Sequence, residues 1–282
     1  MSETLFSDRI PHRIIPWGVT EREFECKRDE LTIRGYEYRP EGENLPIAIV
    51  CHGIMARLNT TRHYAMEFSA LGYAAFCFDF NGGSISGNRS DGKTTDMTVL
   101  TEVQDLEAVI DYVRELKYVD RNRIFLMGCS QGGYVSAIVA AKNKYPIQKL
   151  CLFYPALCIP DDARSGKVMR TRVDLNNLPE IIHCGPMALG KQYALDVLDM
   201  DAYDIISKYK GRVLIVHGTD DKIVNIDNSK HAVTAYLSTK PEGMTDEERV
   251  KLAVIENGEH MFNLEHDLEA IKYMDDFARL EK

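Results

Sequence analysis

Residues 123–141 read RIFLMGCSQGGYVSAIVAA: a short apolar run, a glycine-rich turn and a second apolar segment. Arg123–Met127 has the length and composition of a buried strand, and a helix pattern starts just after Ser130 and runs through Ala141. The G-x-S-x-G between them is typical of an elbow that strains the serine backbone and exposes its hydroxyl at the edge of a sheet. Glycines flank the serine because side chains there would collide with the strand and helix. We interpret Ser130 as a nucleophile; the alternative is an ordinary strand-to-helix turn.

Apolar runs of strand length recur along the chain, and each is nearly continuous, as in parallel strands that are covered on both faces. Helical patterns lie between them, and residues 99–116 carry an apolar stripe at three- and four-residue steps. This alternation predicts an α/β fold with a mostly parallel, doubly wound sheet. Glu21–Tyr38 predicts an antiparallel hairpin that leads into the sheet. The five further runs are Ile47–Cys51, Ala74–Phe80, Lys149–Tyr154, Val213–His217 and Leu252–Glu256.

Composition narrows the class of protein. The 282 residues are 45% hydrophobic and 27% charged, which predicts a globular chain of one domain with an insertion. The formal net charge of −9 disfavours nucleic acid as a partner. We see neither a signal peptide nor an apolar stretch long enough for a membrane span. The seven cysteines form no C-x-x-C pair, and Cys51, Cys77 and Cys151 lie in apolar runs, which indicates buried thiols in a reducing compartment. We therefore expect a cytoplasmic protein.

One connection between predicted strands is unusually long. It runs from Pro155 to about Tyr209, whereas such folds ordinarily use roughly 2–6 residues. We interpret it as a cap above the carboxyl ends of the strands. The predicted organisation is an N-terminal extension at 1–20, a core of residues 21–155 and 210–282, and an inserted cap at 156–209.

Two smaller features lie outside this alternation. We expect Trp17, the only tryptophan, to anchor the N-terminal extension on the body of the protein. Thr239–Arg249 is a polar loop in which Thr245 and Glu248 have the spacing of a helix capping box. We assign this loop no function.

A serine hydroxyl is a weak nucleophile and needs a base. The chain order expected with this elbow is serine, then acid, then histidine. Asp220 and Asp221 follow one predicted strand and His260 follows the next, at strand carboxyl ends where such sites assemble. The G-x-x-D-x-x-V spacing favours Asp221 over Asp220 as the acid. We favour His260 as the base because His266 falls in the final helix pattern, where a surface position is expected.

Acyl transfer also needs hydrogen-bond donors for the developing oxyanion. One candidate is the backbone N–H of Gln131, directly after the nucleophile. The second candidate is the backbone N–H of Ile54, in the loop after the strand Ile47–Cys51. We interpret His52, in the same loop, as a structural residue.

Together these motifs resemble those of the α/β-hydrolases over essentially residues 22–282. More narrowly, the chain is similar to bacterial cinnamoyl (feruloyl) esterases with a short inserted cap. The resemblance implies an α/β-hydrolase fold, cleavage of esters between hydroxycinnamic acids and alcohols or sugars, no metal or other cofactor, and a homodimer. The segments that carry it are CHGIMARLNTTRHYA (51–65), FDFNGGS (78–84), GCSQGG (128–133), FYPALCIPDDARSG (153–166) and LIVHGTDDKIV (214–224).

The resemblance also implies cap residues that meet a ring hydroxyl of the acyl group. By position, Asp162 and Tyr193 match two of these polar residues. Met169 stands where some members have glutamine, Asn81 starts the segment where members usually have G-H-G, and Asn225 replaces a frequent proline. None of these differences affects the three candidate catalytic residues.

The predicted reaction is a two-step acyl transfer on a small-molecule ester. Ser130, deprotonated by His260, attacks the carbonyl; His260 then protonates the leaving alcohol, and water releases the acyl group. The alternatives are a prolyl-oligopeptidase-like peptidase, a thioesterase or acyltransferase with the same residues, and a hydrolase-fold binding protein without catalysis. A metal hydrolase is disfavoured because the sequence holds no H-E-x-x-H or other spaced ligand set.

Overall fold

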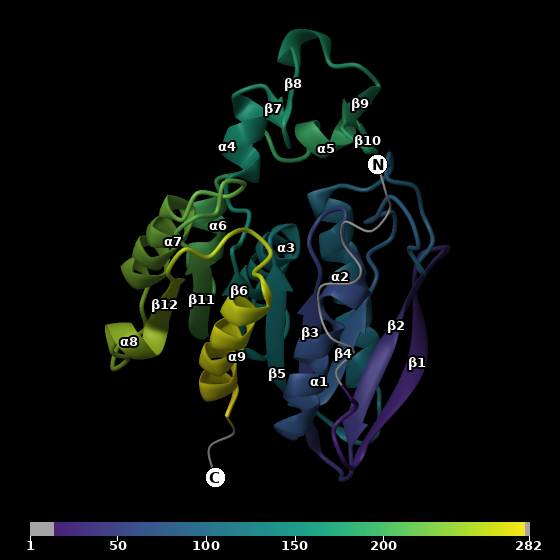
Figure 1. The fold of residues 1–282 in the computed structure, drawn as a ribbon, viewed down its shortest axis with the longest axis vertical. Helices are drawn as coiled ribbons and strands as arrows, with labels where there is room; N and C mark the ends of the chain where they lie inside the picture. Colours follow the sequence, from purple (N-terminus) through teal and green to yellow (C-terminus); the bar gives the residue numbers. More distant parts are fainter. Residues whose placement is uncertain (1–13, 280–282) are drawn as a thin grey trace.

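The computed structural model describes residues 14–279, and its centre is an eight-stranded sheet (Figure 1). The strand order is β1-β2-β4-β3-β5-β6-β11-β12; the pairs β1–β2 and β2–β4 are antiparallel and the other neighbours are parallel. The predicted α/β class and the predicted hairpin are confirmed. The strands are β1 (Val19–Arg28), β2 (Leu31–Pro40), β3 (Leu45–Cys51), β4 (Ala74–Phe78), β5 (Val119–Cys129), β6 (Ile147–Phe153), β11 (Arg212–Gly218) and β12 (Val250–Ile255).

All six predicted buried strands are present, and their ends differ from the prediction by a few residues. The largest difference is in β5, which begins at Val119 rather than Arg123. Val119 pairs with Leu45, and the register then shifts before Ile124 pairs with Ile47. The polar residues in this irregular stretch hide the start of the strand from a search for apolar runs.

Helices cover both faces of the sheet, and the alternation of side chains in β3 explains why. Ile47, Ile49 and Cys51 belong to the core cluster that includes residues of α2, α3 and α7, whereas Ala48 and Val50 belong to the cluster that includes residues of α1 and α9. A strand that buries both faces must be apolar throughout. These helices are α1 (Arg62–Ala70), α2 (Val99–Arg114), α3 (Gln131–Ala141), α7 (Asp227–Ser238) and α9 (Leu264–Ala278).

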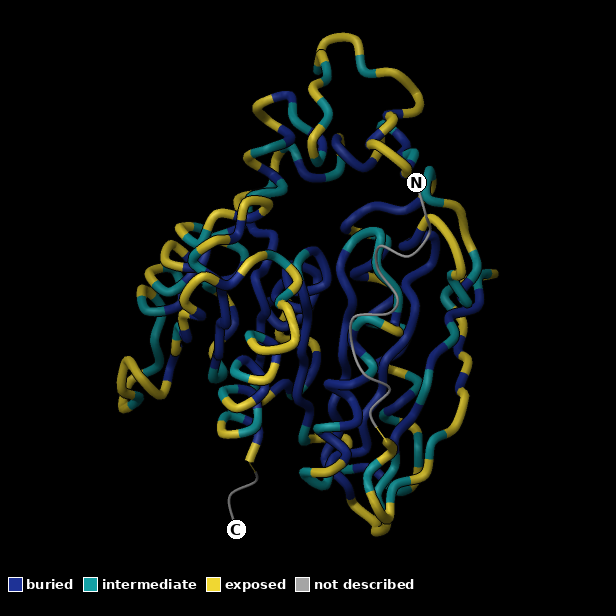
Figure 2. The backbone as a smooth tube through the Cα atoms, in the orientation of Figure 1, coloured by how far each residue is buried: buried dark blue, intermediate teal, exposed yellow. Residues whose placement is uncertain are grey.

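Figure 2 shows the central strands, such as β3 and β4, as the most deeply buried part of the chain. Exposed residues lie on the edge strand β1, on the outer helices and on the chain between β6 and β11, called the inserted segment below. All seven cysteines carry free thiols, and Cys51, Cys77 and Cys151 are fully buried, as predicted. Among residues 14–279, no helix combines the length and the apolar composition needed to cross a bilayer.

The chain between β6 and β11 forms short elements, most of which stand above the sheet in Figure 1. Its final helix differs, because α6 packs against α3 and α7 and buries Ala202 and Ile206 there. The division of the chain into core and cap stays a prediction. The elements are α4 (Ile159–Arg164), β7 (Lys167–Val168), β8 (Thr171–Arg172), η3 (Leu175–Asn177), β9 (Ile181–Cys184), β10 (Met187–Gly190), α5 (Gln192–Leu195) and α6 (Ala202–Ser207).

The expectation for Trp17 is wrong. Its side chain is fully exposed, in a turn closed by the bond from Val19 N–H to Pro16 C=O (3.1 Å), so the indole does not pack on the body formed by residues 14–279. Residues 1–13 of the predicted N-terminal extension lie outside the described residues.

The two short helices outside the layers described above follow local sequence signals. The capping box of Thr245 and Glu248 is present and starts α8 (Asp246–Arg249). The 3₁₀ turn η2 (Leu58–Thr60) precedes α1.

Candidate active site

Ser130 occupies the strained turn that the sequence predicts. It lies between β5 and α3 with φ 53° and ψ −120°, a conformation that residues with a side chain rarely adopt. A Cβ on Gly128 would come within 2.2 Å of the carbonyl oxygen of Gly132, and a Cβ on Gly132 within 2.2 Å of that of His52. These backbone contacts explain why both positions are glycine.

The structure brings Ser130, His260 and Asp221 together from three strand ends. Ser130 follows β5, Asp221 follows β11 and His260 follows β12. The Oγ of Ser130 lies 3.1 Å from Nε2 of His260, and Nδ1 of His260 lies 2.7 Å from Oδ2 of Asp221. Because a carboxylate only accepts, Nδ1 carries the proton, and the free Nε2 accepts the hydrogen bond of the serine hydroxyl.

The neighbouring candidates lie elsewhere. Asp220 is exposed and forms an ion pair with Lys222 at 3.4 Å. His266 lies in the first turn of α9, where its backbone N–H donates to the side chain of Asn263 at 3.0 Å. Neither contacts Ser130 or His260 in the hydrogen bonds recorded for residues 14–279.

Asp221 is held as a buried anion. Burial of the carboxyl raises its pKa, but the hydrogen bonds from His217 and His260 outweigh this effect and hold the pKa of Asp221 well below its usual range. Its second oxygen accepts the backbone N–H groups of Ile223 (2.8 Å) and Val224 (2.9 Å). The carboxylate is therefore ionised and fixed in orientation at neutral pH.

His217 is a partner of Asp221 that sequence reasoning missed. It is fully buried at the end of β11, and its Nε2 lies 3.1 Å from Oδ2 of Asp221 and 3.0 Å from the carbonyl oxygen of Val224. Both neighbours accept, so Nε2 carries the proton and Nδ1 accepts from the hydroxyl of Ser229 (2.7 Å). The available signal was a histidine inside the apolar run LIVHG, directly before the acid loop.

The loop after β3 lies close to the serine. A Cβ on Gly53 would come within 3.0 Å of the Cβ of Ser130. The N–H groups of Met55 and Ala56 donate to the carbonyl oxygens of Gly83 (3.1 Å) and Gly53 (3.2 Å). Among the described residues neither Gly53 nor Ile54 has a backbone acceptor for its N–H, so the N–H of Ile54 stays the predicted donor of the loop.

His52 is buried and has local partners. Its Nδ1 donates to the carbonyl oxygen of Gly53 (2.8 Å), and its Nε2 accepts the backbone N–H of Phe80 (3.1 Å). Burial lowers the pKa of His52, which favours this neutral form. These bonds agree with the structural role predicted for His52.

Gln131 is the first residue of α3, so its backbone N–H has no acceptor within the helix. Its buried side chain points away from solvent: Nε2 donates to Oε2 of Glu102 (2.8 Å), and Oε1 accepts the hydroxyl of Tyr193 (2.6 Å). Glu102 is a second residue that sequence reasoning missed, although a glutamate one turn from Val99 in an apolar stripe signals a buried carboxyl.

The two predicted cap residues differ in their surroundings. Tyr193 lies on α5 with a side chain only 4% exposed, and its hydroxyl reaches Gln131. Asp162 lies on α4, is partly exposed and forms an ion pair with Lys167 at 3.0 Å. Tyr193 therefore reaches the residue next to Ser130, whereas Asp162 pairs with Lys167 within the inserted segment.

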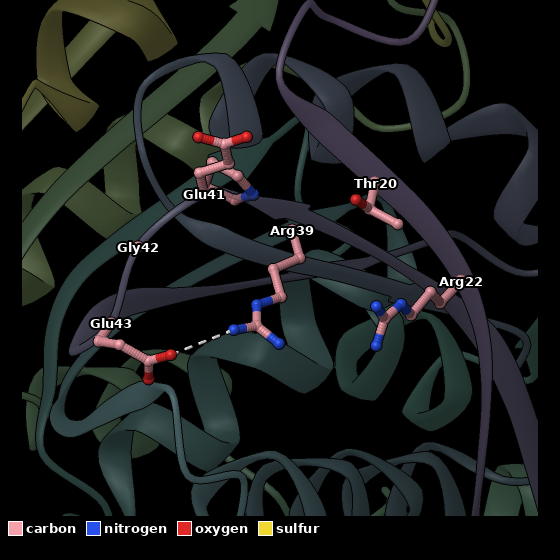
Figure 3. Close-up of a pocket in the computed structure, with 7 residues that line it drawn as sticks. Thr20, Arg22, Arg39, Glu41, Gly42 and Glu43 are labelled. Atoms are coloured by element: carbon pink, nitrogen blue, oxygen red, sulfur yellow. Dashed lines mark ion pairs between the residues drawn. The ribbon is translucent and has the colours of Figure 1, made fainter.

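A separate hollow of about 360 Å³ lies on the β1–β2 hairpin (Figure 3). In it Arg39 pairs with Glu43 at 3.5 Å, and the Arg39 guanidinium lies over the ring of Tyr118. β2 is antiparallel to β4, and β4 runs parallel to β3 and β5. The hollow beside the carboxyl end of β2 therefore lies at the opposite end of the strands from Ser130. Its lining residues are Thr20, Arg22, Arg39, Pro40, Glu41, Gly42 and Glu43.

Known proteins share this architecture. A family model described as serine aminopeptidase, S33 matches residues 42–182. Quorum-quenching protein AidA of Acinetobacter baumannii is 30% identical over 134 residues, 46% of this chain and 42% of AidA. The alignment thus spans less than half the length of that relative.

Two solved structures illustrate the fold. Est1E from Butyrivibrio proteoclasticus, with ferulic acid bound, superposes with a TM-score of 0.79 at 25% identity, over 90% of this chain and 98% of Est1E. The Pyrococcus furiosus esterase Pf2001 superposes with a TM-score of 0.68 at 18% identity, over 92% of this chain and 91% of Pf2001. At 18% identity, the similarity to Pf2001 shows only that the two proteins share a fold.

Proposed function

The chain belongs to the serine aminopeptidase S33 family of α/β-hydrolases, and from this premise we propose that it cleaves carboxylic esters through Ser130, His260 and Asp221. The observation that carries the proposal is the continuous hydrogen-bond path from the strained serine to the buried anion, with distances of 3.1 and 2.7 Å. Such a path supplies a base for the nucleophile and a fixed tautomer for the base.

In this mechanism His260 takes the proton of Ser130 as the serine attacks the ester carbonyl. The imidazolium that forms is stabilised by Asp221 and then protonates the leaving alcohol. Water, deprotonated by the same histidine, hydrolyses the acyl-enzyme and regenerates the serine.

The oxyanion of each tetrahedral intermediate is bound by the N–H groups of Ile54 and Gln131. Gln131 contributes a helix N-terminal N–H, which is also at the positive end of the dipole of α3. Ile54 contributes an N–H that has no backbone acceptor among the described residues, in a loop whose Gly53 lies against Ser130. Donors fixed in advance stabilise the charge that develops in the transition state.

We propose hydroxycinnamoyl esters as the substrate class. Support comes from Est1E, whose solved structure holds ferulic acid and which is 25% identical over nearly its whole length. Asp162 and Tyr193 are the proposed contacts to the acyl ring hydroxyl. Exposed apolar side chains next to the acid and the base, Ile223 and Met261, favour a substrate with an apolar part.

A peptidase is the second candidate, because the matching family model is described as a serine aminopeptidase. The same serine, base and oxyanion donors serve either leaving group, so only substrates separate the two. Thioesters and binding without turnover are further outcomes of the same test.

The test compares the wild-type protein with Ser130→Ala on methyl ferulate, a short-chain p-nitrophenyl ester, a thioester and an aminoacyl amide. We expect ferulate turnover and a loss of about 10⁵–10⁶-fold in kcat in the variant. A fluorophosphonate should label the wild-type serine and leave Ser130→Ala unlabelled. Retention of most activity in Ser130→Ala would refute the nucleophile, and turnover of the amide alone would identify the peptidase.

A further inference from the structure

A chain of buried side chains connects the inserted segment to the residue that follows the nucleophile. Tyr193 on α5 donates its hydroxyl to Oε1 of Gln131 (2.6 Å), and Nε2 of Gln131 donates to Oε2 of Glu102 on α2 (2.8 Å). Glu102 and Gln131 are 0% exposed and Tyr193 is 4% exposed. The orientation of the amide follows from its partners, because its nitrogen can only donate and its oxygen can only accept.

The inserted segment meets the start of α2 at other points as well. The hydroxyl of Thr98, the N-cap of α2, donates to Asp196 (2.7 Å), and that of Thr94 donates to the carbonyl oxygen of Ala188 (2.6 Å). A Cβ on Gly190 would come within 2.2 Å of the carbonyl oxygen of Thr95, so the two backbones touch. The same end of α2 therefore carries Glu102 and receives the inserted segment.

We propose that Tyr193 and Glu102 are positioning residues that hold the Gln131 side chain between the inserted segment and α2, and thereby fix the Gln131 backbone N–H as an oxyanion donor. The inference rests on the proposed function, because it explains how the proposed oxyanion donor is held in place. It gives Tyr193 a role for every substrate, whether or not the acyl group carries a ring hydroxyl.

The physical argument concerns the first turn of a helix. The N–H of Gln131 needs a fixed direction, because an oxyanion donor acts only when it is aimed at the charge in advance. The side chain of the same residue is tied at both ends of its amide, to two elements that lie outside α3. Loss of either tie frees the side chain and lets the residue at the helix start shift.

The protonation state of Glu102 agrees with this role. Burial raises the pKa of Glu102 to about 8; the bond from Gln131 lowers it and the carboxyl of Asp105 raises it. The other titratable groups that face it are Tyr193 from α5 and Cys51 from β3. Its Oε1 is buried without a hydrogen-bond partner among residues 14–279, so the site stabilises a charge poorly. The raised pKa favours the protonated carboxyl near neutral pH, with its other oxygen accepting from Gln131.

The experiment measures kcat and KM of Tyr193→Phe with methyl 4-hydroxycinnamate and with methyl cinnamate, which lacks the ring hydroxyl. Complete loss of an oxyanion donor costs about 10²–10³-fold, so a displaced donor should lower kcat about 10-fold, with KM within about 2-fold. The decrease should be equal for both esters. Tyr203→Phe is the matched control: it removes a tyrosine hydroxyl from α6 that bonds to Asn228 (3.0 Å), and it should leave kcat unchanged.

A second pair of variants tests the other tie. Glu102→Gln keeps a neutral acceptor for Gln131 and should retain kcat near the wild-type value, whereas Glu102→Leu should lower kcat about as much as Tyr193→Phe. If the two residues only stabilised the fold, Tyr193→Phe and Glu102→Leu would both lower the thermal stability. They would not lower kcat at an unchanged KM, and Glu102→Gln would not restore kcat.

The rate of fluorophosphonate labelling provides a readout that needs no ester. The phosphoryl oxygen of the probe occupies the oxyanion site, so Tyr193→Phe and Glu102→Leu should be labelled about 10-fold more slowly. Labelling at the wild-type rate, or a loss confined to the KM of the hydroxylated ester, would overturn the inference and leave the esterase intact. A wild-type protein that is labelled but turns over no ester would instead overturn the proposed substrate.

Discussion

The elbow around Ser130 and the inserted segment above it are held by different kinds of contact. The carbonyl oxygen of Ser130 accepts N–H groups of Gly133, Tyr134 and Ala156, and its own N–H donates to Phe153 (2.9 Å). The inserted segment consists of helices of three to six residues and strands of two to four. It reaches the body through side-chain hydrogen bonds and through buried apolar residues such as Leu189 and Val197. Backbone contacts thus define the geometry at the serine, whereas side-chain packing and single hydrogen bonds together hold the segment above it.

This difference has an energetic consequence. A short helix or a two-stranded ribbon is unstable alone, so the inserted segment depends on its contacts with the body. The elbow lies within a sheet buried on both faces and keeps its geometry through many neighbours. Substitutions at the elbow should therefore have large effects, and those at single bonds of the inserted segment small ones.

After the loss of the nucleophile itself, the largest effect is expected for Asp221→Asn. The asparagine cannot hold the proton on Nδ1 of His260, so the base presents the wrong tautomer to Ser130. We expect kcat to fall about 10⁴-fold, measured on whichever ester the wild-type protein cleaves. Asp220→Asn is the matched control, one residue away and exposed, and should leave kcat unchanged. Equal losses in the two variants would contradict the assignment of the acid.

The elbow and the order of its partners could be predicted because their signals are local. G-x-S-x-G needs only its neighbouring strand and helix, and the G-x-x-D spacing separates Asp221 from Asp220 within one loop. The parallel strands follow in the same way from continuous apolar runs, except for the irregular start of β5.

The remaining contacts join residues distant in sequence, and no pattern in one segment reveals them. Glu102 is 29 residues from Gln131, and Tyr193 is 62 residues from it. His217 lies close to Asp221 in sequence. However, a histidine in an apolar strand is as typical of a packed core residue as it is of a partner of the catalytic acid, so its position alone does not reveal this contact. Trp17 shows the opposite error, because a large aromatic side chain predicts burial that the turn before β1 does not provide.

The next effect in size is expected for Gly132→Ala. The new Cβ would meet the carbonyl oxygens of His52 (2.2 Å) and Cys51 (2.8 Å), which are backbone atoms with little freedom to move. We expect a loss of about 2–4 kcal/mol in the free energy of unfolding, measured by urea denaturation, and a lower kcat.

Gly185→Ala is the control from the inserted segment. Its Cβ would meet nothing within 4 Å, although the φ of +66° adds strain. The cost should stay near 1 kcal/mol, with kcat unchanged. A similar loss of unfolding free energy in Gly132→Ala and Gly185→Ala would contradict the expected difference between the elbow and the inserted segment.

A smaller effect, with a defined pH dependence, is expected for Glu102→Gln. The pKa of Glu102 is raised in the folded protein, so the folded state binds this proton more tightly than the unfolded chain does. The free energy of unfolding of the wild-type protein should therefore fall as the pH rises from about 4.5 towards 8, and the glutamine variant should lack this contribution.

Urea denaturation at pH 5 and pH 8 checks this expectation. The difference in stability between Glu102→Gln and the wild type should shift in favour of the variant by on the order of 3 kcal/mol between the two pH values. Glu115→Gln, at the exposed C-cap of the same helix, is the control for removal of one charge. Parallel pH curves for wild type and Glu102→Gln would show that the buried carboxyl is not protonated.

The smallest effect is expected for Asp196→Ala, which removes the bond from Thr98 to the inserted segment and an exposed bond from Gln192 within it. One hydrogen bond contributes about 1 kcal/mol, so the free energy of unfolding should fall by about that amount and kcat by about 2-fold. Asp204→Ala, which removes an exposed ion pair with Lys208 (2.9 Å) on α6, should change stability by less than about 0.5 kcal/mol.

The double variant Asp196→Ala/Tyr193→Phe then asks whether the two bonds hold one unit. Asp196 and Tyr193 lie three residues apart, and both bond to partners outside the inserted segment. If the two bonds fix the same placement of α5, the second substitution lowers kcat by a smaller factor than it does in the wild-type protein. The effects on kcat are then not additive. Additive effects on kcat would mean that each bond acts only on its own partner. The placement of the segment as a whole would then not influence Gln131.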